Sequence, residues 1–267
     1  MTVATIAVPR PGNLAGQLTD YFLSRIDAIP VDPDPCEHIY IPDFFPADFY
    51  SEMLVHLPED KYFRQMPHAD ALRPDGTSTR LYLDLYPEQL WFLPEKQRVF
   101  WSTLAKAMKA KSVQEAFKRK FEKQLEKRFA EKTASMNYNP SLTLMRDLGG
   151  YRIKPHCDTL GKTITTQFYL PKDKSQEHLG TIFHLRGDDG PDDRKKRMRF
   201  LPASGYAFPV QKNKSWHSVD ATTSSDGVRN SLMMIYHVRN YRKLKLNLRL
   251  RDRIRGVMEA TKGGKRS

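Results

Sequence analysis

The segment 150–158 ends in His156 and Asp158, two side chains that can bind a metal ion. We expect this segment to be an extended strand. Residues two apart on a strand lie on the same face, so the imidazole and the carboxylate can converge on one point. A neutral imidazole and a carboxylate are two members of the 2-His-1-carboxylate set that holds non-haem Fe(II) with open coordination positions. A polar strand end would give the same pair by chance, so the interpretation requires a third ligand.

The third ligand has to come from the remaining histidines of the eight in the chain. His217 is the candidate, because it lies in a strand-like segment, 214–219, that follows an apolar stretch at 206–209. Twelve residues later, Arg229 and Ser231 open an apolar strand and share one face of it. A guanidinium recognises a carboxylate with two hydrogen bonds, and a neighbouring hydroxyl adds a donor. We expect structural roles for His184 and His237.

The order and spacing of His156-x-Asp158, His217 and Arg229-x-Ser231 resembles that of the Fe(II)- and 2-oxoglutarate-dependent dioxygenases. The resemblance covers roughly residues 37–60 and 140–238. It implies a mainly β fold with helices, a double-stranded β-helix (jelly roll), in which His156, Asp158 and His217 hold the catalytic iron. It also implies 2-oxoglutarate as cosubstrate, chelating the iron through its 2-oxo acid end and meeting Arg229 and Ser231 with its far carboxylate. Dioxygen is the remaining reactant.

Several positions narrow the reaction that this resemblance implies. Asp158 keeps a carboxylate where the family's halogenases have a small residue, and Ile235 stands where its nucleic-acid demethylases have a second arginine. Both observations argue against those two activities. Prolyl-hydroxylase relatives commonly have a lysine at the position of Arg229 and a tyrosine near the place of Arg146 and Asp147. This departure leaves open which residues complete the cosubstrate site, and it weakens the protein-prolyl interpretation.

Two cations near the His-Asp pair indicate the charge of the substrate. Arg152 and Lys154 share parity with His156 and Asp158, so a regular strand would point them toward the metal. Buried unpaired charge is costly, which predicts a substrate with a carboxylate or a phosphate. The alternatives are that the two cations pair with acidic residues of the protein or lie beyond the rim of the barrel. Further candidates for substrate contacts are Arg146 and Gln167, and Thr165 is a weaker one.

The elements that must position these residues change in character along the chain. From residue 141 onward, short apolar segments alternate with glycine-containing turns, which is typical of an antiparallel sandwich or barrel. Before it, we expect helices at 16–29 and 46–57, strands at 38–45 and 80–86, and an irregular loop at 58–78. In the segment 94–132, Ser112 and Glu115 form a capping-box pattern ahead of apolar residues every fourth position. The predicted core strands are 141–147, 150–158, 163–170, 179–185, 204–210, 214–219 and 228–238.

The length of 267 residues fits one large domain with appendages. We predict an N-terminal arm and helix at 1–36, a single dioxygenase domain at 37–238 and a basic C-terminal extension at 239–267. Within the domain, residues 94–132 form a helical insert and 140–238 the jelly-roll core.

The net charge of +13 is concentrated at one end of the chain. Residues 239–267 hold eleven Lys and Arg against two acidic residues, so the rest of the chain is close to balanced in charge. Nucleic acid is therefore not expected to be the main partner. Two cysteines cannot form a disulfide framework. No signal peptide and no apolar run of about 20 residues is visible. These features predict a cytoplasmic protein without a membrane span, and its oligomeric state is left open.

The function predicted from these residues is oxidation of a small-molecule substrate by an iron- and 2-oxoglutarate-dependent oxygenase, with release of succinate and CO2. One alternative is hydroxylation of a protein or peptide side chain by the same chemistry. Another is a non-catalytic jelly roll that binds a metal or a ligand. A structural metal site would be closed by four protein ligands, whereas three are found here, which favours an enzyme.

Overall fold

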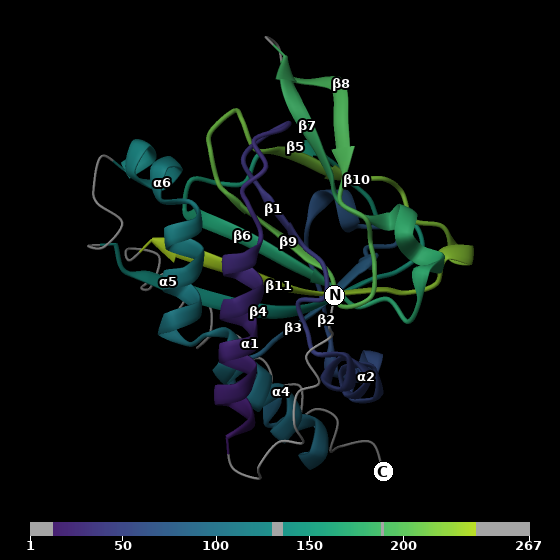
Figure 1. Cartoon of the computed structure of the whole chain (residues 1–267). Coiled ribbons are helices and arrows are strands. Elements are labelled where there is room, and N and C mark those ends of the chain that lie inside the picture. The colour runs from purple at the N-terminus through teal and green to yellow at the C-terminus, as the bar shows by residue number, and fades with distance from the viewer. Residues whose placement is uncertain (1–12, 130–135, 188–189, 239–267) are drawn as a thin grey trace.

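The computed structural model describes residues 13–129, 136–187 and 190–238. Two antiparallel sheets face each other, and helices cover the outer side of the larger one (Figure 1). The α-helices are α1 (Leu14–Ala28), α2 (Ala47–Val55), α3 (Pro87–Leu90), α4 (Glu95–Met108), α5 (Lys111–Lys120) and α6 (Glu122–Phe129). The strands are β1 (Ile39–Ile41), β2 (Arg64–Gln65), β3 (Arg80–Asp84), β4 (Tyr138–Asp147), β5 (Ile153–His156), β6 (Lys162–Tyr169), β7 (Ile182–Gly187), β8 (Gly190–Arg197), β9 (Gly205–Pro209), β10 (Trp216–Val219) and β11 (Arg229–Val238).

The large sheet has the order β1-β9-β6-β11-β4-β3-β2, and the small sheet has the order β5-β10-β7-β8. They meet face to face through an aromatic cluster that includes Phe183 of the small sheet and Tyr206 and Phe208 of the large one. This two-sheet arrangement confirms the predicted jelly-roll fold with associated helices.

Strand β11 shows how the sequence pattern produces two different faces. Leu232 and Met234 belong to the core under the helices, whereas Arg229 and Ser231 lie on the opposite face, inside the barrel. Successive side chains of a strand point to opposite faces, so this period-two pattern places the polar pair inside.

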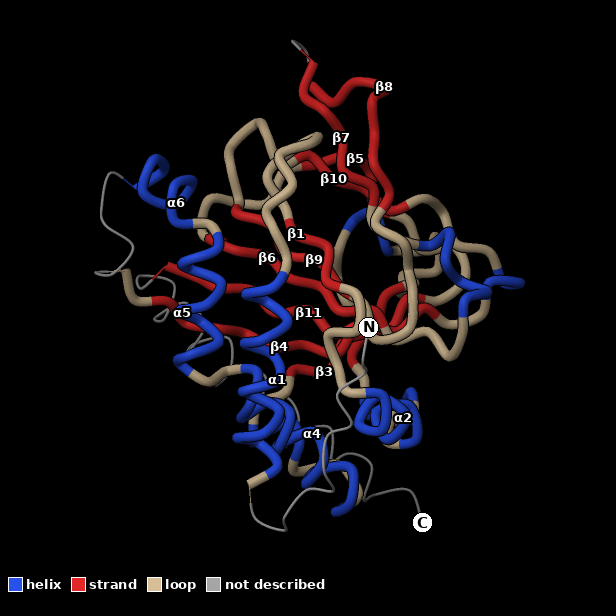
Figure 2. Tube along the Cα trace, in the orientation of Figure 1, coloured by secondary structure: helices blue, strands red, loops and turns tan. Residues whose placement is uncertain are grey.

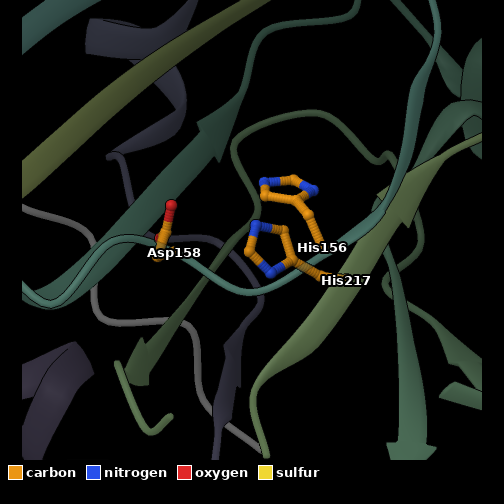
Figure 3. A group of neighbouring side chains, drawn as sticks. All are labelled: His156, Asp158 and His217. Carbon is orange, nitrogen blue, oxygen red and sulfur yellow. The ribbon is translucent and has the colours of Figure 1, made fainter. Parts of the chain in front are cut away.

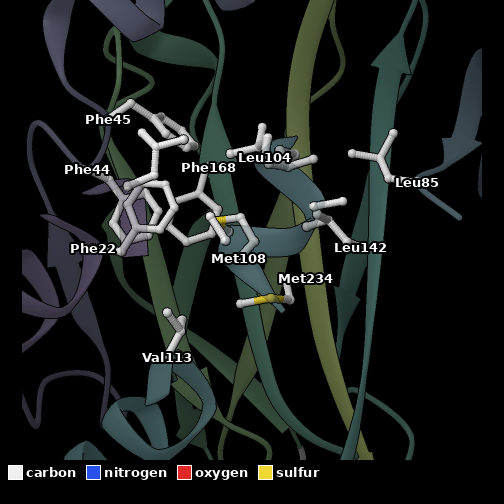
Figure 4. Packing of buried hydrophobic residues seen from close by; sticks show 14 of the residues in the cluster. Phe22, Phe44, Phe45, Leu85, Leu104, Met108, Val113, Leu142, Phe168 and Met234 are labelled. Atoms are coloured by element: carbon white, nitrogen blue, oxygen red, sulfur yellow. The ribbon is translucent and has the colours of Figure 1, made fainter. Parts of the chain in front are cut away.

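Helices α1, α4 and α5 pack over the outer face of the large sheet (Figure 2). The rings of Phe22 and Phe44 stack with centroids 4.6 Å apart, and Phe44 stacks on Phe168 of β6 at 4.0 Å (Figure 4). Burial of a side chain of this size contributes about 1.5–3 kcal/mol relative to exposure. The helix α1 is therefore part of the main core.

The segment 94–132 is helical, but the predicted capping box is wrong. Helix α5 begins at Lys111 with Ala110 as its N-cap residue, so Ser112 already lies inside the helix and does not cap it. The helix is interrupted at Phe121, which separates α5 from α6. The fourfold spacing of Val113, Phe117 and Phe121 nevertheless marks the buried face correctly. Spacing identifies the packed face, while local backbone geometry decides where a helix begins.

Two other segments differ from the expectation. Residues 58–78 contain the 3-10 helices η1 (Asp60–Tyr62) and η2 (Ala69–Ala71), and β2, which pairs with β3. Strand β8 was not predicted, because its polar sequence lacks the apolar alternation of a half-buried strand. The predicted arm before residue 13 and the basic extension from 239 lie outside the described residues, and the domain boundaries stay a prediction. No described helix is long and apolar enough to cross a bilayer.

Candidate metal and cosubstrate site

His156, Asp158 and His217 come together on the inner side of the small sheet, each with a ligand atom within 4.8 Å of the others (Figure 3). His156 ends β5 and faces His217 of β10 directly across the ladder, with ring centroids 4.2 Å apart. Asp158 follows in the next turn. The short strand pair thus brings together residues far apart in the sequence.

Backbone carbonyls orient both imidazoles. Nδ1 of His156 lies 2.9 Å from the carbonyl oxygen of Lys154, and Nδ1 of His217 lies 3.0 Å from that of Ser215. A carbonyl oxygen only accepts hydrogen bonds, so Nδ1 carries the proton in both rings and the Nε2 lone pair is left for a metal ion.

Asp158 is held as a carboxylate. Lys162 Nζ forms an ion pair with Asp158 Oδ1, and Thr165 Oγ1 donates a 2.6 Å hydrogen bond to Oδ2. Burial raises the pKa of Asp158, but the charges of Lys162 and His217 and the two hydrogen bonds outweigh it and hold the pKa at about 2. Burial lowers the pKa of His217 to about 4. Near neutral pH the site therefore presents a carboxylate and a neutral imidazole, the protonation states that metal binding requires.

This donor set fits non-haem Fe(II). Two imidazole nitrogens and one carboxylate leave coordination positions open, as in the 2-His-1-carboxylate centres. A structural zinc site would instead be closed by four ligands.

Arg229 is completely buried on β11 and lacks a partner for one nitrogen. Its Nε donates to the carbonyl of Leu179 at 2.9 Å, and Nη1 donates to Asp147 Oδ2 at 2.6 Å. The guanidinium carbon lies 4.7 Å from the ring centroid of Phe200. Nη2 has no hydrogen-bond partner among the described residues. A buried donor left unpaired costs about 1–3 kcal/mol, so Nη2 marks a position for an acceptor oxygen.

Asp147 joins Arg229 to a second arginine. In the sheet it pairs with Arg229 of β11 on one side and with Arg80 of β3 on the other. Arg80 binds the carboxylate with both Nε and Nη2, at 2.6 and 3.0 Å. The two guanidiniums and one carboxylate carry a net charge of +1, and a single carboxylate from a ligand would neutralise it.

Strand β6 connects the metal ligand Asp158 to Ser231, the residue that shares a face of β11 with Arg229. Its inward residue Thr165 holds Asp158, and two residues on, Gln167 Nε2 donates to Ser231 Oγ at 2.8 Å. Because Ser231 Oγ accepts this bond, its own proton remains to be donated to a ligand. Two residues of strand span about 7 Å. The Asp158 and Ser231 ends of the site are thus separated by about one repeat of the strand.

Tyr206 lies at the Ser231 end of the site, opposite Gln167 in the sheet. Its hydroxyl donates to Gln167 Oε1 at 2.8 Å, and burial raises its pKa, so it stays a neutral donor.

Arg146 does not reach this site. It lies on the other face of β4 from Asp147, where it binds Asp60 and Asn230 and covers the ring of Phe63. The expectation that Arg146 contacts substrate is not supported by this position. Adjacent residues of a strand cannot share a face, so only Asp147 of the two points inward.

Arg152 and Lys154 also lie elsewhere than expected, because β5 is irregular. Two pairs link β10 and β5: His217 with His156, and Val219 with Ile153. The two partners are two residues apart on β10 but three residues apart on β5. This bulge puts Ile153 and His156 on one face, so the parity argument that turned the cations toward the metal is wrong. Both cations are exposed and line a cavity beside the segment 69–79.

Sequence reasoning missed Arg80 and Lys162. Lys162 lies four residues after Asp158, at the start of β6, and this short separation between opposite charges was an available signal. Arg80 had none, because only the long-range pairing of β3 with β4 brings it to Asp147.

The fold has relatives among solved structures. A prolyl hydroxylase from Trichoplax adhaerens, in complex with a hypoxia inducible factor peptide fragment, aligns with a TM-score of 0.54 at 12% identity, covering 89% of this chain and 97% of that one. A Pseudomonas putida prolyl-4-hydroxylase aligns at 0.51 and 12% identity, covering 83% and 99%. Prolyl 4-hydroxylase from Phytophthora capsici aligns at 0.50 and 13% identity, covering 89% and 70%.

Sequence comparisons gave no match, either to a protein-family model or to a curated protein. The likeness therefore concerns the backbone. The chain has the double-stranded β-helix fold of these prolyl hydroxylases.

Proposed function

We propose that this protein is an Fe(II)- and 2-oxoglutarate-dependent dioxygenase that hydroxylates or otherwise oxidises a small-molecule substrate, releasing succinate and CO2. One observation carries the proposal. A three-ligand His-Asp-His group shares the barrel interior with a buried arginine whose Nη2 has no partner in the described part of the chain. Iron bound there would couple the decarboxylation of 2-oxoglutarate to the reduction of dioxygen.

The residues of the chain divide the work of binding. His156, Asp158 and His217 hold the metal, each already in the required protonation state or tautomer. Nη2 of Arg229 and the hydroxyl of Ser231 bind the far carboxylate of 2-oxoglutarate. Asp147 and Arg80 fix the guanidinium of Arg229, and the ring of Phe200 beside it keeps water away.

The cavity of about 600 Å³ beside β5 has the size of a small-ligand pocket, which is compatible with a small-molecule substrate. Pockets for small ligands typically measure about 300–1,000 Å³. A peptide side chain as substrate remains the alternative within the same chemistry. Release of succinate on screening small molecules and candidate peptides would distinguish the two.

The test of the proposal is anaerobic spectroscopy with Fe(II) and 2-oxoglutarate. We expect a metal-to-ligand charge-transfer band in the wild type and its loss in His217→Ala. The matched control is His56→Ala, because His56 lies at the end of α2 and stacks on Phe100, away from the barrel interior. A wild type without the band, or a His217→Ala variant that keeps it, would contradict the proposal.

A further inference from the structure

The cavity of about 600 Å³ opens between the segment 69–79 and the beginning of β5. Its charged lining consists of Asp70, Arg73, Arg152 and Lys154. Strand β5 is an edge strand of the small sheet, and η2 approaches that edge, where the backbone N–H of Lys154 donates to Asp70 Oδ2 at 3.3 Å. The cavity is thus built by two segments that are 80 residues apart in the sequence and tied by a hydrogen bond.

The lining carries more positive than negative charge. The guanidinium of Arg73 is fixed by the carbonyl of Gly149 and the hydroxyl of Thr77, both at 3.3 Å, and the Thr77 hydroxyl in turn donates to Asp75 Oδ1 at 2.7 Å. Across the part of the chain that the structure describes, no carboxylate forms an ion pair with Arg73, Arg152 or Lys154. Three cations, with Asp70 in the lining and Asp75 behind Arg73, leave a net charge of +1 on this wall. Such a surface attracts an anion.

The same strand carries a candidate metal ligand. The carbonyl oxygen of Lys154 accepts the hydrogen bond from Nδ1 of His156 that orients the imidazole. The cavity and the metal position are therefore both built on β5, the cavity at its beginning and the candidate ligand His156 at its end.

We infer that this cavity binds an oxyanion of the substrate, a carboxylate or a phosphate, through Arg152 and Lys154. The inference rests on the proposed function, which supplies the reaction at the other end of the molecule. Arg73 contributes charge from a fixed position, and the exposed side chains of Arg152 and Lys154 adapt to the anion. Leu72 and Ala221 give the cavity an apolar part for the carbon skeleton beside the charged group.

Calorimetric titration of the purified full chain with inorganic phosphate and with acetate tests this site. The titrations are run without metal and again with anaerobic Fe(II) and 2-oxoglutarate. We expect the wild type to bind one of the two anions, which identifies the oxyanion. The double variant Arg152→Gln/Lys154→Gln should bind that anion at least about tenfold more weakly. This loss is equivalent to one charge-assisted hydrogen bond.

The control is the pair Lys96→Gln and Lys106→Gln, which removes the same charge from exposed positions of α4. Lys154→Arg should retain binding. No saturable binding by the wild type would overturn the inference, as would equal binding by the Arg152/Lys154 variant or equal loss in the α4 control. The charge-transfer band, recorded on the same samples, reports separately on the proposed function, because the anion titration without metal does not depend on it.

Discussion

Asp147 and Arg229 face each other across β4 and β11, and their side chains meet at 2.6 Å with neither exposed to solvent. Removing one partner of a buried ion pair leaves the other charge uncompensated, at a cost of about 3–5 kcal/mol. Here Asp147→Asn leaves the buried guanidinium of Arg229 and the partly buried one of Arg80 without a carboxylate. We expect the free energy of unfolding, measured with urea, to fall by about that amount.

A surface pair provides the comparison for this substitution. Asp27 pairs with Arg119 at 3.4 Å, and both side chains are more than half exposed. Asp27→Asn should change the free energy of unfolding by less than about 1 kcal/mol. Equal small effects at Asp147 and Asp27 would show that the buried arrangement adds nothing to stability.

Arg229→Lys should weaken binding of 2-oxoglutarate about tenfold to a hundredfold, because a lysine keeps the charge but cannot reproduce three directed contacts. The 2-oxoglutarate concentration dependence of the anaerobic charge-transfer band measures this affinity. Iron affinity should not change, because Arg229 does not bind the metal. A simultaneous loss of iron would indicate that the substitution disturbs the fold.

Lys162→Met should weaken iron binding about tenfold to a hundredfold, the usual effect of removing a group that supports a metal ligand. The ion pair with Lys162 helps to keep Asp158 ionised and oriented. Titration of Fe(II) followed by intrinsic fluorescence gives the affinity. Lys162→Arg, which retains the charge, should restore most of it, and an unchanged affinity in Lys162→Met would remove Lys162 from the site.

The metal-free protein should lose stability as the pH falls from about 6.5 to about 4. The pKa of His217 is lowered to about 4 in the folded state, whereas an unfolded histidine titrates near 6.5. The unfolded state binds more protons in this window, so folding stability rises with pH there, by up to about 3 kcal/mol. Thermal unfolding at several pH values checks this.

His217→Gln, which cannot titrate, should flatten that pH dependence. Asp158 contributes in the same direction at lower pH. Its pKa is depressed to about 2, so its stabilisation is present above about pH 4 and is lost as the pH falls toward 2. An unaltered slope between pH 4 and 6.5 in His217→Gln would assign the effect to another group.

The sequence allowed the fold and the position of the polar groups to be predicted where simple periodicity holds. Alternation along β11 placed Arg229 and Ser231 on one face, and they lie together in the interior. The resemblance in order and spacing to the dioxygenases implied a cluster of His156, Asp158 and His217, and their ligand atoms lie within 4.8 Å. Their metal-binding role stays a prediction.

Periodicity failed where the chain departs from it. The bulge in β5 reversed the expected direction of Arg152 and Lys154, because one extra residue changes the parity of everything before it. The pairing of Arg80 with Asp147 is a tertiary contact between strands nearly seventy residues apart, which no local pattern encodes. Strand β8 was missed because its polar sequence shows no alternation of apolar and polar residues from which a strand could be predicted.

The extra residue in β5 also constrains the shape of any molecule that contacts both sides of the strand. Lys154 and His156 are only two residues apart, but Lys154 lines the cavity whereas His156 faces His217 across the ladder. A ligand cannot pass through the hydrogen-bonded sheet, so it must curve around the outer edge of β5, where the Lys154 N–H binds Asp70. Compounds that are rigid and straight would be rejected, and bent or flexible ones would be accepted.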